Sequence, residues 1–303
     1  MTSIVFPGQG SQFVGMSHDF YENFKVAQLT FEEIQDYVKI DLKSIIFDGK
    51  DDLINITKYT QISIFAASVA IFKSLQTVED INENNINFAL GHSLGEYTAL
   101  ACSNKLNLHD CSQILKKRGE LMNDAVEPNQ SGMAALIGKD AHHVAKIIKN
   151  NNIDLEIAND NSPIQVVVSG AMSEIIKNKN FFLSNEIKKY VVLNVSSAFH
   201  SKYMNEAQKA LSQEIDNLNF HTNKINIISN FNAQISNDNK LIIHSLKNQM
   251  ANSVKWTQSI KKLEEFGEKN IIEIGPNKIL SGLIKRISDK FDIKSVGSIS
   301  DLK

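Results

Sequence analysis

The pentapeptide Gly91-His92-Ser93-Leu94-Gly95 places a serine between two glycines. Before it, the apolar run Ile86–Leu90 predicts a buried strand, and after it Glu96–Cys102 predicts the start of a helix. A strand, G-x-S-x-G and a helix in this order form a nucleophile elbow, in which glycines permit a sharp turn and the helix N-terminus offers N–H groups to a developing negative charge. The pattern therefore predicts Ser93 as a nucleophile, and an ordinary turn is the alternative.

A serine hydroxyl needs a base to take its proton, and histidine is the usual base near pH 7. His200 lies in Ser196-Ser197-Ala198-Phe199-His200-Ser201, directly after the predicted strand Tyr190–Val195. Catalytic side chains favour loops at such positions, so His200 is the candidate base, and an exposed surface histidine is the alternative. His92 adjoins the serine, but neighbouring residues in a tight turn point in different directions, which favours a packing or positioning role.

The composition limits the class of protein. The chain has 303 residues, of which 42% are hydrophobic and 22% charged, which is typical of a soluble globular protein with one large domain or a large and a small one. A net charge of −2 argues against a nucleic-acid partner, and we expect no apolar run long enough to span a membrane. Cys102 and Cys111 lack metal-ligand spacing. We therefore expect a cytoplasmic protein without a metal site.

Arginine is scarce, because Arg118 and Arg286 are the only arginines among 32 basic residues. Where lysine is the default cation, an arginine can indicate a need for its planar fork geometry. The alternative for Arg118 is a solvated helix residue beside Lys116 and Lys117.

The order of predicted elements divides the chain. Residues 127–196 contain a β-α-β-β-α-β pattern, the ferredoxin-like unit, in which Asn159 to Pro163 form a turn cluster. The flanking segments, 1–126 and 197–303, alternate strands and helices, which predicts an α/β domain with a mainly parallel sheet covered on both faces. The predicted helices of this larger domain are Asp19–Ile40, Gln61–Leu75, Leu108–Ala125, Ser201–Leu218, Leu241–Ala251, Thr257–Phe266 and Lys278–Ile287.

Five motifs occur in a fixed order along nearly the whole chain. They are Gly8-Gln9-Gly10-Ser11-Gln12, Gly91-His92-Ser93-Leu94-Gly95-Glu96, Arg118-Gly119, Ala198-Phe199-His200-Ser201 and Glu273-Ile274-Gly275-Pro276-Asn277. Together they resemble the malonyl-CoA:acyl carrier protein transacylases and, more widely, the acyltransferase domains of fatty acid and polyketide synthases. The resemblance implies an α/β-hydrolase-like large domain carrying a ferredoxin-like insert.

The resemblance also implies a role for each matching residue. Ser93 would carry the acyl group, and His200 would act first as base and then as acid. The backbone N–H groups of Gln9 and Leu94 would form the oxyanion hole, and Arg118 would clamp the malonyl carboxylate. The main-chain carbonyl at Gln249 would orient His200. The remaining residues of the implied site contact substrate: Phe199, His92, Met122, Asn159 and Asn161. For the two asparagines, ordinary turn chemistry is the alternative.

These assignments predict a ping-pong transfer of malonyl from malonyl-CoA to a holo acyl carrier protein in fatty acid synthesis, by a monomer without a cofactor. Phe199 is expected to exclude an α-methyl group and so to disfavour methylmalonyl. A free-standing acyltransferase of polyketide synthesis is one alternative. Others are an esterase or thioesterase with Asp160 or another acid as third catalytic member, and a carrier-docking module without activity.

Overall fold

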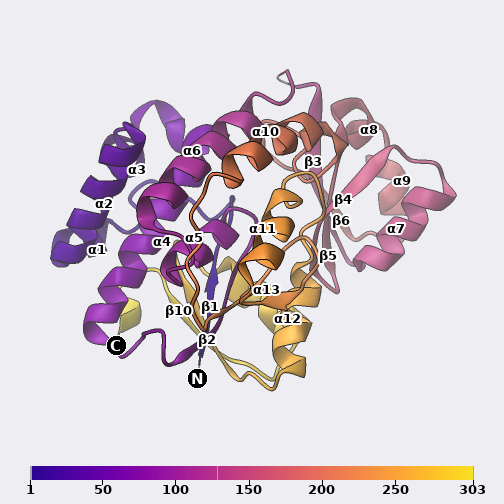
Figure 1. Ribbon diagram of the computed structural model, residues 1–303. Coiled ribbons are helices and arrows are strands. Elements are labelled where there is room, and N and C mark those ends of the chain that lie inside the picture. The colour runs from indigo at the N-terminus through magenta and orange to yellow at the C-terminus, as the bar shows by residue number, and fades with distance from the viewer. Residues whose placement is uncertain (1, 128, 303) are drawn as a thin grey trace.

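The structure, a computed structural model, describes residues 2–127 and 129–302 (Figure 1). Its strands form two separate sheets, one of six strands and one of four. The larger sheet has the order β10-β9-β1-β2-β7-β8, and all its pairings are parallel except that of β8 with β7. Its strands are β1 (Thr2–Phe6), β2 (Ile86–Gly91), β7 (Asn226–Ile228), β8 (Ile235–Ser236), β9 (Asn270–Ile274) and β10 (Asp292–Val296). The mainly parallel sheet predicted from the sequence is therefore confirmed.

Both faces of this sheet are covered. Ile4, Val5 and Phe6 on β1 are consecutive and all are fully buried. Because successive side chains of a strand point to opposite faces, such a run requires packing on both sides. Ile4 and Phe6 belong to one apolar cluster and Val5 belongs to another. The sheet is thus the central layer of an α/β arrangement, in which each face has its own core.

The helices around the larger sheet come from both ends of the chain. They are α1 (His18–Asn23), α2 (Lys25–Val38), α3 (Leu42–Ile46), α4 (Thr57–Val78), α5 (Gly95–Cys102), α6 (Leu108–Asn123), α10 (Asn205–Ile215), α11 (Asn239–Lys247), α12 (Trp256–Glu265) and α13 (Ile279–Ile287), with the 3₁₀ turns η1 (Lys50–Asn55), η2 (Lys202–Met204) and η3 (Ile299–Leu302).

Helix α4 corrects one expectation drawn from composition. Among the helices of the described residues, α4 alone is long and apolar enough to cross a membrane by length and composition. However, 78% of its most apolar window is buried inside the protein. It packs closely against α2, α5 and α6. Its apolar surface is therefore used as the centre of the larger core.

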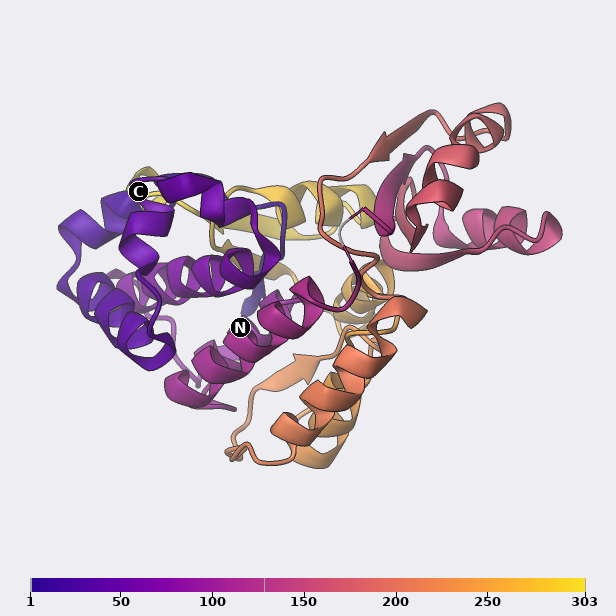
Figure 2. The same cartoon turned by 90° about the horizontal axis from the view of Figure 1, so that it is seen from above.

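The smaller sheet is antiparallel with the order β4-β5-β3-β6. Its elements are β3 (Ser131–Ile137), α7 (Ala141–Asn150), β4 (Leu155–Ser162), β5 (Gln165–Ala171), α8 (Met172–Lys177), α9 (Lys179–Ser184) and β6 (Lys189–Val192). This follows the predicted β-α-β-β-α-β order, with the second helix divided at Asn178. Seen from above, these elements form a lobe at one side of the molecule (Figure 2).

The structure corrects several predicted boundaries. The helix predicted over Asp19–Ile40 is interrupted by Phe24, whose backbone is extended (φ −123°, ψ 117°) and which separates α1 from α2. The turn cluster predicted over Asn159 to Pro163 is wrong for its first four residues, because β4 continues to Ser162 and the turn begins only at Pro163. Its polar groups find partners far along the chain: Asp160 donates its backbone N–H to the Val254 carbonyl and accepts a hydrogen bond from the Thr257 hydroxyl.

Candidate active site

Ser93 lies at the tip of a tight turn between β2 and α5. Its backbone is left-handed, with φ 53°, a conformation that costs free energy for a residue with a Cβ atom. The flanking glycines have no room for a side chain: a Cβ at Gly91 would lie 2.1 Å from the Gly95 backbone, and a Cβ at Gly95 would lie 2.2 Å from the Phe6 carbonyl oxygen. Strand and helix can therefore approach closely enough to raise the serine only with glycine at both positions.

The structure brings His200 to Ser93, although 106 residues separate them in sequence. The distance from Ser93 Oγ to His200 Nε2 is 2.8 Å. On the other side of the ring, Nδ1 faces two carbonyl oxygens, that of Gln249 at 3.1 Å and that of Asn252 at 3.2 Å. Since carbonyls only accept, Nδ1 carries the ring proton of the neutral histidine and Nε2 is free to accept the serine proton.

Burial keeps this histidine in the unprotonated form, which can accept a proton. His200 is 4% exposed. Burial, with a further contribution from the nearby charge of Arg118, lowers the pKa of His200 to about 3. The imidazole is therefore neutral at physiological pH. Asp160, the acid considered as a third catalytic member, hydrogen-bonds Thr257 and is not among the groups that contact His200 in the described chain.

Arg118 is almost completely buried, with 1% of its surface exposed. Its Nη2 donates to Ser93 Oγ at 3.1 Å and to Gln249 Oε1 at 3.0 Å, and its Nη1 donates to Gln61 Oε1 at 2.5 Å. The guanidinium carbon lies 5.4 Å from the centre of the Tyr97 ring. Within the described residues, Arg118 forms no ion pair with a carboxylate. It is thus a buried cation whose hydrogen-bond partners are all neutral.

Two backbone N–H groups beside Ser93 have no acceptor in the part of the chain that the structure describes, and they belong to Gln9 and Leu94. Leu94 is the N-cap residue of α5, where backbone N–H groups are unpaired by geometry. The Gln9 loop is brought against the elbow by Gly8, at which a Cβ would lie 2.4 Å from the His92 carbonyl oxygen. Gln9 and Leu94 line the same cavity as Ser93, so both N–H groups are candidates for the oxyanion hole expected from the sequence.

A cavity of about 330 Å³ opens above Ser93. It is lined by predicted site residues from both parts of the chain, namely Gln9, His92, Ser93, Leu94, Arg118, Met122, Asn159, Asn161, Phe199 and His200. Gln249 lies behind this lining. His92 Nε2 contacts Asn161 Oδ1 at 2.8 Å, which joins the elbow to β4. The second arginine, Arg286, is exposed and donates to Gln165, which also lines the cavity.

Three polar residues beside the site were not singled out by the sequence. Glu96, Asn230 and Gln61 are all buried. The Asn230 side chain accepts from the Ser93 N–H at 2.7 Å and donates to the Gly91 carbonyl at 2.7 Å. Glu96 belongs to the motif that contains Ser93. It gave no signal of its own, because an acidic residue in the first turn of a helix is usually solvated and stabilises the helix dipole. Asn230 lies in the loop after β7, and functional residues are frequent in such loops. Its position was therefore the signal that could have identified it as a site residue.

Residues 4–303 match the acyl transferase domain family. The chain belongs to that family. One relative of this acyl transferase, the malonyl CoA-acyl carrier protein transacylase of Bacillus subtilis (strain 168), is 34% identical over 292 residues, covering 94% of this chain and 90% of the relative.

Solved structures agree with the family assignment. An acyl-carrier-protein S-malonyltransferase from Bartonella henselae superposes with a TM-score of 0.94 at 32% identity, covering 99% of this chain and 96% of the other. A malonyl-transacylase solved in complex with its type II PKS acyl carrier protein gives a TM-score of 0.93 at 31% identity, covering 99% and 97%.

The geometry of this acyl transferase fits transfer through a serine ester. The residues that carry a hydroxyl, a neutral imidazole and two free N–H groups all line one cavity, and these groups are the minimal set for attack on a thioester carbonyl. Among the residues that the structure describes, no group of three or more His, Cys, Asp or Glu side chains could hold a metal ion.

Proposed function

We propose that the protein transfers a malonyl group from malonyl-CoA to the phosphopantetheine thiol of a holo acyl carrier protein, through a malonyl ester on Ser93. The observation that carries this proposal is the state of Arg118. A buried guanidinium is normally paired with an anion, because an unpaired buried charge is costly. Here its partners are neutral, and one of them is the Ser93 hydroxyl at 3.1 Å. An acyl group that ends in a carboxylate would supply the missing anion at the point where Ser93 attacks.

In the first half-reaction, Ser93 Oγ attacks the thioester carbon of malonyl-CoA while His200 Nε2 takes the hydroxyl proton. The oxygen that becomes negative accepts hydrogen bonds from the N–H groups of Gln9 and Leu94. The carbon–sulfur bond then breaks, and His200 gives its proton to the leaving thiolate of CoA. The low pKa of His200 favours this return of the proton, because the thiolate is a much stronger base than the imidazole.

The second half-reaction reverses these steps with the carrier thiol. His200 takes the thiol proton, and the sulfur attacks the malonyl-Ser93 ester. Collapse of the intermediate breaks the bond to Ser93 Oγ, to which His200 returns the proton. The carbonyl oxygens of Gln249 and Asn252 accept from Nδ1–H throughout and stabilise the transient imidazolium.

The relatives support the partners of this reaction, since one solved transacylase is complexed with its acyl carrier protein. That carrier belongs to polyketide synthesis, so we keep both fatty acid and polyketide synthesis as settings.

We also propose that the α/β-hydrolase-like large domain comprises 1–126 and 197–303 and carries residues 127–196 as a ferredoxin-like subdomain. The strand orders of the two sheets support this division. We propose a cytoplasmic monomer that uses no cofactor, nucleic acid or membrane.

Intact-protein mass spectrometry after brief incubation with malonyl-CoA tests the proposal. We expect one malonyl adduct on the wild-type chain, none on Ser93→Ala, and discharge of the adduct by holo carrier protein. Steady release of free malonate without an adduct would instead indicate a hydrolase. Absence of both adduct and malonate would favour a carrier-docking module without activity.

A further inference from the structure

We propose that Glu96 is a positioning residue for the acyl transfer, which holds the side-chain amide of Gln249 so that its oxygen faces Arg118. This inference rests on the proposed function, because it assumes that Arg118 binds the carboxylate of the acyl group. It assigns a task to a buried carboxylate that takes no part in the chemical steps described above.

Gln249 is the junction of the site. Its backbone carbonyl accepts from His200 Nδ1 at 3.1 Å, and its side-chain Oε1 accepts from Arg118 Nη2 at 3.0 Å. Its Nε2 donates to the Ser93 carbonyl at 2.9 Å and to Glu96 Oε2 at 2.7 Å. One glutamine therefore contacts the nucleophile's backbone, the base and the cation that we assign to the substrate.

The orientation of the Gln249 amide decides whether these contacts are favourable. The oxygen and nitrogen of a glutamine amide have nearly the same shape, so packing alone does not select one orientation. In the reversed orientation, N–H groups would face the donors of Arg118, and the amide oxygen would face the Ser93 carbonyl and Glu96. An ionised carboxylate only accepts hydrogen bonds, and the bond it receives is charge-assisted. Glu96 thereby fixes the orientation that leaves Arg118 with an acceptor.

Glu96 is itself held in place by the elbow. Its Oε2 also accepts from the Asn230 N–H at 3.1 Å, and the Asn230 side chain joins Gly91 and Ser93. Its Oε1 is buried and has no hydrogen-bond partner in the described chain, where Glu96 also forms no ion pair. A fully buried carboxylate in these surroundings is costly. Stability alone would favour an uncharged side chain here, which points to a functional reason for the acid.

The charge on Glu96 changes in an accessible range of pH. Burial raises the pKa of this carboxyl to about 7, while hydrogen bonds from Gln249, Asn230 and Ser229 and the charge of Arg118 oppose the rise. The ionisable groups that interact with it are Arg118 on α6 and Tyr97, its neighbour on α5. His200 titrates far lower, so the two ionisations are separated on the pH scale. Protonation of Glu96 weakens its hold on Gln249 and hence the placement of Arg118.

The test compares two acyl donors on three variants. Malonyl-CoA needs Arg118, whereas p-nitrophenyl acetate needs only Ser93, His200 and the oxyanion hole. We expect Glu96→Ala to lower kcat/KM for malonyl-CoA by roughly 30-fold or more and for p-nitrophenyl acetate by less than about threefold. Glu96→Gln keeps an acceptor for Gln249 and restores most of the activity, but it removes the step near pH 7 from the malonyl-CoA profile. Glu268→Gln is the control, because it alters another buried glutamate, which accepts a hydrogen bond from Asn87. It should leave kcat/KM unchanged for both donors.

Equal losses for both donors in Glu96→Ala would overturn the proposal, as would a step near pH 7 that survives in Glu96→Gln. If Glu96→Ala does not fold, the pH profile of Glu96→Gln decides alone. Failure of the proposed function gives a different result, because wild-type protein would then show no preference for malonyl-CoA over acetyl-CoA.

Discussion

At the residue scale, the site is built around Arg118, a buried cation that forms no ion pair with a carboxylate among the described residues. Replacing Arg118 with alanine removes the guanidinium but leaves Ser93, His200 and the free N–H groups of Gln9 and Leu94. A bidentate, charge-assisted pair in a buried site contributes about 3 kcal/mol or more, so we expect kcat/KM for malonyl-CoA to fall by at least roughly 100-fold. Acetyl-CoA, which has no carboxylate, should lose less than about tenfold. Steady-state kinetics with the two donors measure the change in preference.

Arg286→Ala is the matched control for this prediction, because Arg286 is the other arginine, is exposed and bonds only Gln165 among the contacts described. It should leave the preference for malonyl unchanged. If Arg118→Ala retained the wild-type ratio of malonyl to acetyl, the clamp assignment would be wrong.

Phe199 carries the second prediction at this scale. It is 5% exposed, lines the cavity and precedes His200, and its carbonyl accepts from Ser169 at 2.6 Å. We infer that this ring occupies the space that a methyl branch on the acyl group would need, and forcing such a branch in costs about 1–3 kcal/mol. We expect Phe199→Ser to raise the methylmalonyl-to-malonyl ratio of kcat/KM by roughly tenfold or more in competition assays. An unchanged ratio would show that the discrimination arises elsewhere.

The residues that the structure brings together at the candidate site could be predicted from the sequence, because the proposed chemistry demands particular types: a serine in an elbow, a histidine after a strand, an arginine among lysines. The residues that hold them could not. Glu96, Asn230 and Gln61 are polar side chains of ordinary types in ordinary positions. Their importance comes from burial and from partners far along the chain, such as Glu96 with Gln249, 153 residues apart.

At the scale of elements, the sequence predicted best where local pattern and tertiary packing agree. The buried strand β2 and the helices α6, α12 and α13 begin and end within two residues of their predicted bounds. Prediction from the sequence failed where partners far along the chain determine the local structure. Polar residues at the end of β4 stay in the strand because they pair with the segment around Val254, and the short edge strands β8 and β10 were missed.

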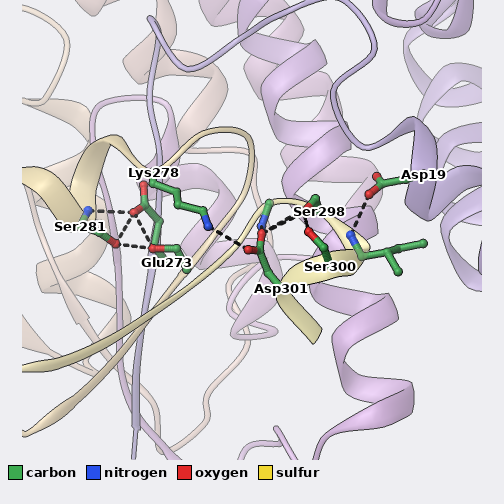
Figure 3. A network of polar contacts seen from close by, with 10 residues as sticks. Asp19, Glu273, Lys278, Ser281, Ser298, Ser300 and Asp301 are labelled. Carbon is green, nitrogen blue, oxygen red and sulfur yellow. Dashed lines mark hydrogen bonds and ion pairs between the residues drawn. The ribbon is translucent and has the colours of Figure 1, made fainter. Parts of the chain in front are cut away.

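Helix α13 depends on one buried acid, Glu273 of β9. Figure 3 shows this carboxylate against the start of the helix, where it accepts from the Leu280 N–H at 2.8 Å and the Ser281 N–H at 2.8 Å. It thus satisfies N–H groups that no helical carbonyl can reach. Beyond it, Lys278 pairs with Asp301 at 2.8 Å and ties this helix to the C-terminal turn. Leu280 and Leu283 of α13 line the cavity.

Glu273→Gln should therefore destabilise the fold, because a glutamine in this place puts an N–H group against donors. We expect the free energy of unfolding to fall by about 1–3 kcal/mol, measured from the urea midpoint at constant m-value. Glu265→Gln, at an exposed end of α12, is the control and should change stability by less than about 0.5 kcal/mol. If both variants unfolded at the wild-type midpoint, Glu273 would not be the cap on which α13 depends.

At the scale of the whole molecule, the site exists only because two sheets meet. The elbow, the Gln9 loop, His200 and the asparagines of β4 come from segments scattered along the chain and line one cavity. Sequence motifs named these residues, but no local pattern fixes how the smaller sheet is turned toward the larger. That arrangement depends on long-range contacts such as His92 with Asn161 and Asp160 with Thr257.

His200 and Glu96, two of the buried ionisable groups of the site, make opposite contributions to the stability of the whole fold. Burial lowers the pKa of His200 from 6.5 to about 3, so the unfolded chain binds more protons between these values and stability rises with pH there. Burial raises the pKa of Glu96 from 4.5 to about 7, so the folded chain binds more protons and stability falls as pH rises through that window. Between pH 4.5 and 6.5 the two slopes oppose one another.

Glu96→Gln removes one of these slopes and so makes the other visible. We expect the variant to gain stability relative to wild type as pH rises from 4.5 to 7, by at most about 3 kcal/mol, since each pH unit is worth up to about 1.4 kcal/mol. Urea unfolding of both proteins across this range measures the difference. Parallel stability curves would mean that Glu96 ionises alike in the folded and unfolded chains. The strong effect of burial on this carboxyl would then be absent, and the step near pH 7 expected in malonyl transfer would lose its physical cause.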